Sequence, residues 1–266
     1  MDATQIAEKA KAIRRHVCES TTAASSGHPG GSLSAADVIA TLYFHSMRHR
    51  PEQPDWRERD RFVLSKGHAA PALYAALAEA GYFSTSNLKE LRRVGKSLQG
   101  HPYVHTPGVE ACTGSLGQGI SIAVGMALSM KLDKIDSHVY CMVGDGECQE
   151  GQVWEAAMAA SHYGLDNFTV IVDRNGLQID GFTEDVMALE PLAQKWRAFG
   201  FDVRKINGHS IPEIMAALAH RDSGKPVAII AATTKGKGVS FMENVCAFHG
   251  TPASQQQLEQ ALEELQ

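Results

Sequence analysis

The hydrophobic residues of this chain follow two different spacings. In some segments they repeat on one helical face, as Val153, Ala156 and Ala160 do, and this spacing predicts amphipathic helices. In others they form short continuous runs, which are typical of strands buried on both faces of a sheet. The predicted helices cover residues 5–21, 35–44, 69–80, 150–162, 189–199, 211–221 and 253–266. One more predicted helix is opened by residues 114–119 and runs to about residue 132. The predicted strands cover residues 62–65, 138–143, 168–172, 201–206 and 226–232.

Helices and strands alternate along most of the sequence. This alternation implies an α/β fold of three layers, in which helices cover both faces of a parallel sheet. The segment 21–34 is rich in small residues and the segment 46–60 is polar and contains prolines, so both are predicted to be loops. Because no linker or internal repeat interrupts the pattern, we expect one domain over residues 1–266.

Composition and charge narrow the class of protein. A formal net charge of -5 without a basic run argues against nucleic-acid binding. The longest apolar stretch, 120–130, is too short to span a membrane, and the polar start of the chain does not resemble a signal peptide. The five cysteines contain no CxxC pair and suit reduced thiols. We therefore expect a cytoplasmic protein without nucleic-acid or membrane partners.

Two polar residues follow neighbouring strands of the predicted sheet. Asp145 follows the strand 138–143, and Asn175 follows the strand 168–172, thirty positions later. A crossover helix between these strands would return Asn175 to the same edge as Asp145. A carboxylate and an amide oxygen suit Mg²⁺, and Leu177 offers a backbone carbonyl as a third ligand. The sequence therefore predicts a metal–phosphate site at the carboxyl edge of the sheet.

Four histidines lie in turns bounded by glycine or proline: His28, His68, His101 and His249. A single histidine of this kind is more often structural. Four of them, all bordering helices or strands, indicate a functional site, because loops on a rigid scaffold carry binding and proton transfer. Their spacing forms no chelating helix pair, so a zinc site is not expected.

Glycines also flank a short loop and several lysines. The segment 114–119, Gly-Ser-Leu-Gly-Gln-Gly, would let a ligand approach the start of a helix, or it is simply a flexible connector. Lys235 follows the last strand, where its ammonium would meet a diphosphate. The alternative for Lys66 and Lys235 is a solvated loop lysine, and this is the interpretation we prefer for Lys237. Glu150 is explained equally well as a favourable acid in the first turn of a helix.

A set of short motifs appears in a fixed order: Ser26-Gly27-His28-Pro29, Ser65-Lys66-Gly67-His68-Ala69, Gly100-His101-Pro102, Gly114-Ser115-Leu116-Gly117-Gln118-Gly119, Gly144-Asp145-Gly146-Glu147 and His249-Gly250. Together they resemble the N-terminal, diphosphate-binding half of transketolase, over nearly the whole chain. Each motif is weak alone, but the set is specific. The resemblance implies the thiamine diphosphate-binding fold, with residues 1–266 as its diphosphate-binding domain.

The resemblance also implies roles for single residues. Mg²⁺, for which Ca²⁺ or Mn²⁺ could substitute, would be held by Asp145, Asn175 and the Leu177 carbonyl. The residues implied to bind thiamine diphosphate are His68, Gly114, Ser115, Leu116, Gly146, Asn175, Lys235 and His249. The residues implied to act on the sugar are His28, His101 and His249. Glu150 would belong to an acidic relay between two active sites.

A partner is expected as well. Transketolases continue with a pyrimidine-binding domain, whose glutamate activates the cofactor, and with a C-terminal domain. Both ends of the cofactor must be held for it to react. We therefore expect the N-terminal subunit of a split transketolase, which meets a C-terminal subunit in a heterotetramer with two copies of each. It would transfer a ketol unit from a ketose phosphate to an aldose, in the pentose phosphate pathway or in a specialised sugar pathway.

Two alternatives remain open. The α subunit of a 2-oxo-acid dehydrogenase shares the Gly-Asp-Gly and asparagine site, and a non-catalytic thiamine diphosphate-binding subunit would share it too. The four loop histidines favour transfer between sugars.

Overall fold

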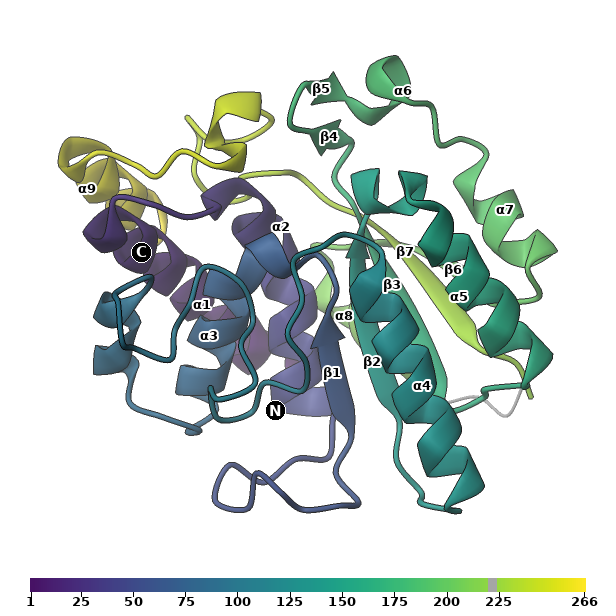
Figure 1. The fold of residues 1–266 in the computed structure, drawn as a ribbon. Coiled ribbons are helices and arrows are strands. Elements are labelled where there is room, and N and C mark those ends of the chain that lie inside the picture. The colour runs from purple at the N-terminus through teal and green to yellow at the C-terminus, as the bar shows by residue number, and fades with distance from the viewer. Residues whose placement is uncertain (220–223) are drawn as a thin grey trace.

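A parallel sheet forms the centre of the computed structural model, which describes residues 1–219 and 224–266 (Figure 1). Its five strands lie in the order β1-β2-β3-β7-β6, and every neighbouring pair is parallel. The strands are β1 (Arg61–Leu64), β2 (Val139–Gly144), β3 (Phe168–Arg174), β7 (Val227–Ala232) and β6 (Asp202–Asn207). A separate antiparallel ribbon pairs β4 (Leu177–Gln178) with β5 (Gly181–Phe182).

Helices cover both faces of the sheet (Figure 1). One layer consists of α1 (Ala3–Ala24), α2 (Pro29–Thr41), α3 (Ala70–Glu79) and α8 (Ile211–Leu218), and α9 (Gln255–Glu264) packs on α1. The other layer consists of α4 (Gln118–Leu132), α5 (Gly151–His162) and α7 (Leu192–Ala198). The short α6 (Thr183–Val186) follows β5. The predicted three-layer α/β fold is confirmed. Within the described ranges, no helix is both long and apolar enough to cross a membrane.

Successive residues of the central strands contribute to two separate cores. In β2, Tyr140 and Met142 pack with α1, α2 and α3, whereas Cys141 and Val143 pack with α4 and α5. Side chains alternate between the faces of a strand, so both sets are buried when helices cover both faces. This explains why the strands consist of continuous apolar runs rather than alternating ones.

The prediction of a loop over 21–34 is wrong. α1 continues to Ala24, and α2 begins at Pro29. Proline suits this position because the backbone N–H groups in the first turn of a helix have no acceptor within the helix, so the N–H that proline lacks is not needed. The small residues that follow serve close packing: a Cβ on Gly30 would lie 2.8 Å from the carbonyl oxygen of Phe248. The ribbon of β4 and β5 was not predicted either. Positions 220 and 221, the end of the predicted helix 211–221, lie outside the described residues.

The parallel arrangement brings the carboxyl ends of the strands to one edge. β1 is followed by Ser65 and Lys66, β2 by Asp145, β3 by Asn175, and β7 leads to Lys235. Gly144 of β2 is paired with Asp173 of β3, so the residues after them leave the sheet side by side. Residues more than 100 positions apart in sequence therefore meet at this edge.

Candidate functional site

A cavity of about 330 Å³ opens at the carboxyl edge of the sheet. It is lined by every predicted site residue except His28, His101 and Ser115. Ser115 is exposed between two lining residues, Gly114 and Leu116. The lining residues that were predicted are His68, Gly114, Leu116, Asp145, Gly146, Glu150, Asn175, Leu177, Lys235 and His249.

The three residues predicted to bind a metal all line this cavity. The Asp145 carboxylate is 2% exposed and accepts hydrogen bonds from the backbone N–H groups of Gly146 (2.8 Å) and Gly176 (2.6 Å). Arg174 also donates to it, at 3.0 Å. The Asn175 amide oxygen accepts from the Leu177 N–H at 3.1 Å. Burial is the largest influence on the Asp145 carboxyl and raises its pKa, with the nearby Asp173 charge acting in the same direction.

The donor set fits a hard divalent cation. A carboxylate, an amide oxygen and the Leu177 carbonyl are the ligand types that Mg²⁺ takes, with its remaining positions left for phosphate and water. Among residues 1–219 and 224–266, no group of three or more His, Cys, Asp or Glu side chains is arranged to hold a metal. The cavity therefore offers a mixed side-chain and backbone oxygen set. Lys235 Nζ, which donates to the Leu177 carbonyl at 3.2 Å, adds a positive charge suited to an anion beside the cation.

A buried ion pair joins Lys66, which lines the cavity, to Asp173 of β3. The side chains of Lys66 and Asp173 are each 1% exposed, and the ammonium donates to the carboxylate and, at 2.9 Å, to the Gly31 carbonyl. The carboxylate also accepts from Ser34 Oγ at 2.6 Å and from the Asn175 amide at 3.2 Å. Burial alone would raise the pKa of Asp173, but Lys66 holds that pKa below its ordinary value. Lys66 is thus not a solvated loop lysine, in contrast to Lys237, which is 38% exposed.

Glu147 is a second buried carboxyl group, and no pattern in the sequence predicts a role for it. It is 2% exposed and accepts hydrogen bonds from Ser65 Oγ (2.5 Å) and from the N–H groups of Gly117 (2.9 Å) and Gly144 (3.0 Å). Burial raises the pKa of this carboxyl. It joins the loops after β1 and β2 to the start of α4. Glu150, in contrast, is exposed in the single chain, at the wall of the cavity.

The four predicted histidines form one cluster. The ring centroid of His28 lies 5.5 Å from that of His68, 5.5 Å from that of His249 and 6.2 Å from that of His101. His68 and His249 stack at 5.1 Å. His68 and His249 line the cavity, whereas His28 and His101 extend the cluster beyond it. The cluster therefore continues the polar groups of this cavity beyond its lining residues.

Burial and then neighbouring positive charges lower the pKa values of these imidazoles. Burial and then Arg92 lower the pKa of His28 to about 4, and burial and then Lys235 lower the pKa of His249 to about 3. Lys235 Nζ lies 2.8 Å from His249 Nδ1, and Arg92 Nη2 lies 3.3 Å from His28 Nδ1. Burial also lowers the pKa of Lys235, to about 8. A neutral imidazole can accept a proton from a bound hydroxyl group and can also donate one to it.

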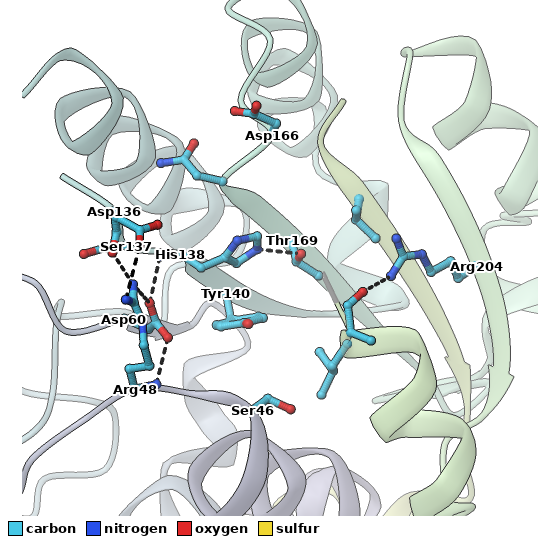
Figure 2. A pocket seen from close by; sticks show the side chains of 14 residues that line it. Ser46, Arg48, Asp60, Asp136, Ser137, His138, Tyr140, Asp166, Thr169 and Arg204 are labelled. Carbon is cyan, nitrogen blue, oxygen red and sulfur yellow. Dashed lines mark hydrogen bonds and ion pairs between the residues drawn. The ribbon is translucent and has the colours of Figure 1, made fainter. Parts of the chain in front are cut away.

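A second cavity, of about 380 Å³, lies at the opposite edge of the sheet (Figure 2). Its two arginines already have partners: Arg48 contacts Asp60 at 3.3 Å and Asp136 at 3.3 Å. Arg204 contacts Asp202 at 3.0 Å and donates to carbonyl groups at the end of α8. It has neither glycine-rich backbone nor a histidine cluster among its lining residues. The carboxyl-edge cavity is therefore the candidate functional site, although it is the smaller of the two.

Comparison with known proteins points the same way. Residues 6–265 match the family described as "Transketolase, thiamine diphosphate binding domain". The chain is 47% identical to the 6-deoxy-6-sulfo-D-fructose transketolase subunit SqwG of Clostridium sp. (strain MSTE9), over 97% of this chain and 95% of that protein. It is 44% identical to an apulose-4-phosphate transketolase subunit of Phocaeicola vulgatus, over 95% of this chain and 90% of that protein.

Solved structures agree with these sequence relatives. The crystal structure of transketolase from Campylobacter jejuni superimposes with a TM-score of 0.94 at 37% identity. That match covers 100% of this chain but only 43% of the solved chain. This chain therefore spans less than half the length of that transketolase.

The buried ion pair generates a stability prediction. Lys66→Met leaves the Asp173 carboxylate buried without a counter-charge, so we expect the free energy of unfolding to fall by about 3–5 kcal/mol. Adding Asp173→Leu removes the unpaired charge. The free energy of unfolding should therefore fall less in the double variant than the sum of its falls in the two single variants. Urea denaturation measures both. Lys237→Met, at an exposed pair, is the control and should change stability by less than about 0.5 kcal/mol. Additive losses would contradict the coupling.

The histidine cluster generates a pH prediction. His28 has a folded pKa of about 4 against an ordinary value of 6.5, so between these pH values the unfolded chain binds more protons. The contribution of neutral His28 to stability is therefore complete above about pH 6.5 and is lost as the pH falls toward about 4. When the pH is lowered from about 7 to about 5, we expect the free energy of unfolding, measured by urea denaturation, to fall less in His28→Asn than in the wild type. Equal losses would show that His28 is not buried in its neutral form.

Proposed function

Since the chain belongs to the transketolase family, in which it matches the thiamine diphosphate-binding domain, we propose that it is the N-terminal subunit of a split transketolase. One observation supports this proposal most strongly. Two relatives are named as transketolase subunits, and the match to this chain covers 95% of the length of one and 90% of the length of the other. The chain would then transfer a ketol unit from a ketose to an aldose together with a partner chain. The partner would carry the pyrimidine-binding domain, in a heterotetramer with two copies of each chain.

We propose that the carboxyl-edge cavity holds the diphosphate end of thiamine diphosphate. Asp145, Asn175 and the Leu177 carbonyl would hold Mg²⁺, and the donor set supports this choice. His68, Gly146, Lys235 and His249 would hold the diphosphate, with Gly114, Ser115 and Leu116 beside the aminopyrimidine end. When bound, the cofactor supplies the carbon nucleophile and the electron sink for cleaving the bond beside a ketose carbonyl.

The histidine cluster would receive the sugar. His28 and His101 lie outside the cavity, so they would face the sugar rather than the phosphates. His249, whose ring centroid is 5.5 Å from that of His28, would contact both the diphosphate and the sugar. As neutral imidazoles they would bind its hydroxyl groups and accept or return protons during transfer. Glu150, exposed in the single chain, is proposed to join the acidic relay only in the assembled enzyme.

The substrate is proposed to be a ketose with a terminal anionic group. One relative is named for a sulfonated ketose and the other for a phosphorylated one, and this favours a specialised sugar pathway over the central pentose phosphate pathway. We also propose a cytoplasmic location, which is supported by the five free cysteines.

The proposal that the enzyme is divided between two chains is tested by reconstitution. The purified chain, a candidate partner carrying the pyrimidine-binding domain, thiamine diphosphate and Mg²⁺ are combined with phosphorylated and sulfonated ketose donors and an aldose acceptor. We expect ketol transfer only when both chains are present, because one chain holds only one end of the cofactor. Transfer by this chain alone would overturn the split. Acylation of a lipoyl group in place of sugar transfer would instead identify a 2-oxo-acid dehydrogenase subunit.

The cation site is tested with Asp145→Ala. Losing only an outer-sphere partner commonly weakens a metal site about 10–100-fold, so losing a direct carboxylate ligand should weaken cofactor retention by more than about 100-fold. Equilibrium dialysis with thiamine diphosphate and Mg²⁺ measures this, and circular dichroism checks the fold. Asp185→Ala, at an exposed residue of α6, should bind as the wild type does. Unchanged retention in Asp145→Ala would refute the assignment.

A further inference from the structure

Arg92 contacts the histidine cluster from outside the cofactor cavity. Its Nη2 lies 3.3 Å from His28 Nδ1, and its Nη1 donates to Ser26 Oγ at 3.0 Å. Arg92 is half-buried, whereas the neighbouring Arg93 is exposed. The guanidinium group therefore has two fixed partners on the segment that leads into α2.

The surrounding backbone is shaped to hold this side chain. Arg92 has a φ of 59°, a left-handed conformation that is uncommon outside glycine, and its N–H donates to the Leu98 carbonyl at 2.7 Å. A Cβ on Gly100 would lie 2.9 Å from Arg92 Cζ. The glycine of the Gly100-His101-Pro102 motif therefore makes room for the guanidinium group rather than for an unusual backbone conformation.

The contact determines which nitrogen of His28 carries the proton. A guanidinium group has only donors, so His28 Nδ1 must accept and must be unprotonated. Burial and the charges of Arg92, His101 and Lys235 lower the pKa of His28 to about 4, so the ring is neutral near pH 7. The single proton is then on Nε2.

The Nε2 end of the ring lies beside the segment that carries His249. A Cβ on Gly250 would lie 3.7 Å from His28 Nε2, and the ring centroids of His68 and His249 are each 5.5 Å from that of His28. His28 therefore presents an N–H donor within the histidine cluster. A donor of this kind selects an oxygen acceptor, such as a sugar hydroxyl or carbonyl oxygen.

We propose that Arg92 is a positioning residue that fixes His28 as its Nε2–H tautomer and aims this donor at an oxygen atom of the sugar. The identity of the sugar rests on the proposed function, but the tautomer does not. Arg92 acts through His28, since the hydrogen bonds of its guanidinium group within the described residues go to Ser26 and His28. Its counterpart at the other side of the cluster is Lys235, whose ammonium contacts His249 Nδ1 at 2.8 Å.

The tautomer is measured on the full chain labelled with ¹⁵N-histidine, by long-range ¹H–¹⁵N correlation, with His28→Asn used for assignment. We expect an unprotonated Nδ1 and a protonated Nε2 in the wild type. Arg92→Met should give a mixture of tautomers and a higher pKa for His28, because it removes both the donor and a positive charge. Gly100→Ala should act in the same direction by displacing the guanidinium group. Arg93→Met is the matched control and should leave the spectrum unchanged.

Activity of the assembled enzyme supplies the second measurement. Arg92→Met should lower kcat/KM for ketol transfer about ten- to a hundred-fold, as expected for loss of a hydrogen bond from a charged group, and Arg92→Lys should lower it less. A protonated Nδ1 in the wild type, or an unchanged tautomer and kcat/KM in Arg92→Met and Gly100→Ala, would overturn the inference while leaving the proposed function intact. The expected tautomer change in a protein without transfer activity would support the role of Arg92 and refute the proposed function instead.

Discussion

The ion pair between Lys66 and Asp173 is the interaction on which the carboxyl edge depends. Two charges removed from water require close pairing and further hydrogen bonds, since an unpaired charge in the interior is strongly unfavourable. Asp173 meets this requirement with four side-chain donors, which come from β1, α2, β3 and β7 and their adjoining loops. One donor is the Asn175 amide nitrogen. By accepting this hydrogen bond, the Asp173 carboxylate fixes the orientation of the Asn175 side-chain amide, and therefore the position of the amide oxygen relative to Asp145.

The charges of the site follow a common rule. Two cations contact histidines of the cluster at Nδ1, Arg92 at His28 and Lys235 at His249. Both imidazoles consequently present Nε2 as a donor. Burial, and then these positive charges, hold the pKa of each ring far below neutrality. A surface of cations and neutral donors suits an anionic cofactor and a sugar rich in oxygen atoms.

The sequence predicts those parts of the site that depend on local pattern and on topology. Apolar runs and helical spacing were sufficient for the parallel sheet, and the short crossover between β2 and β3 made the meeting of Asp145 and Asn175 predictable. Long-range choices were not predictable. Lys66, Lys235 and Lys237 all adjoin glycine, yet the first is paired with a carboxylate 107 positions away and the last is half-exposed. Arg92 lies 64 positions from His28, in a polar stretch without periodicity, so only the folded chain identifies its partner.

The cavity is built differently at its two ends. The groups at the strand ends are buried and bonded within this chain: Asp145 and Lys235 are each 2% exposed. Two apolar side chains of the same cavity are open to solvent, Leu116 at 36% and Ile179 at 68%, and Phe182, which pairs with Leu177 in the β4–β5 ribbon, is 57% exposed. Exposed apolar side chains grouped at a cavity are typical of a surface that another chain covers. The polar end would thus be organised by this chain, and the apolar end would acquire its second wall from the proposed partner. That division gives a physical reason why a diphosphate-binding half would be conformationally complete yet catalytically incomplete.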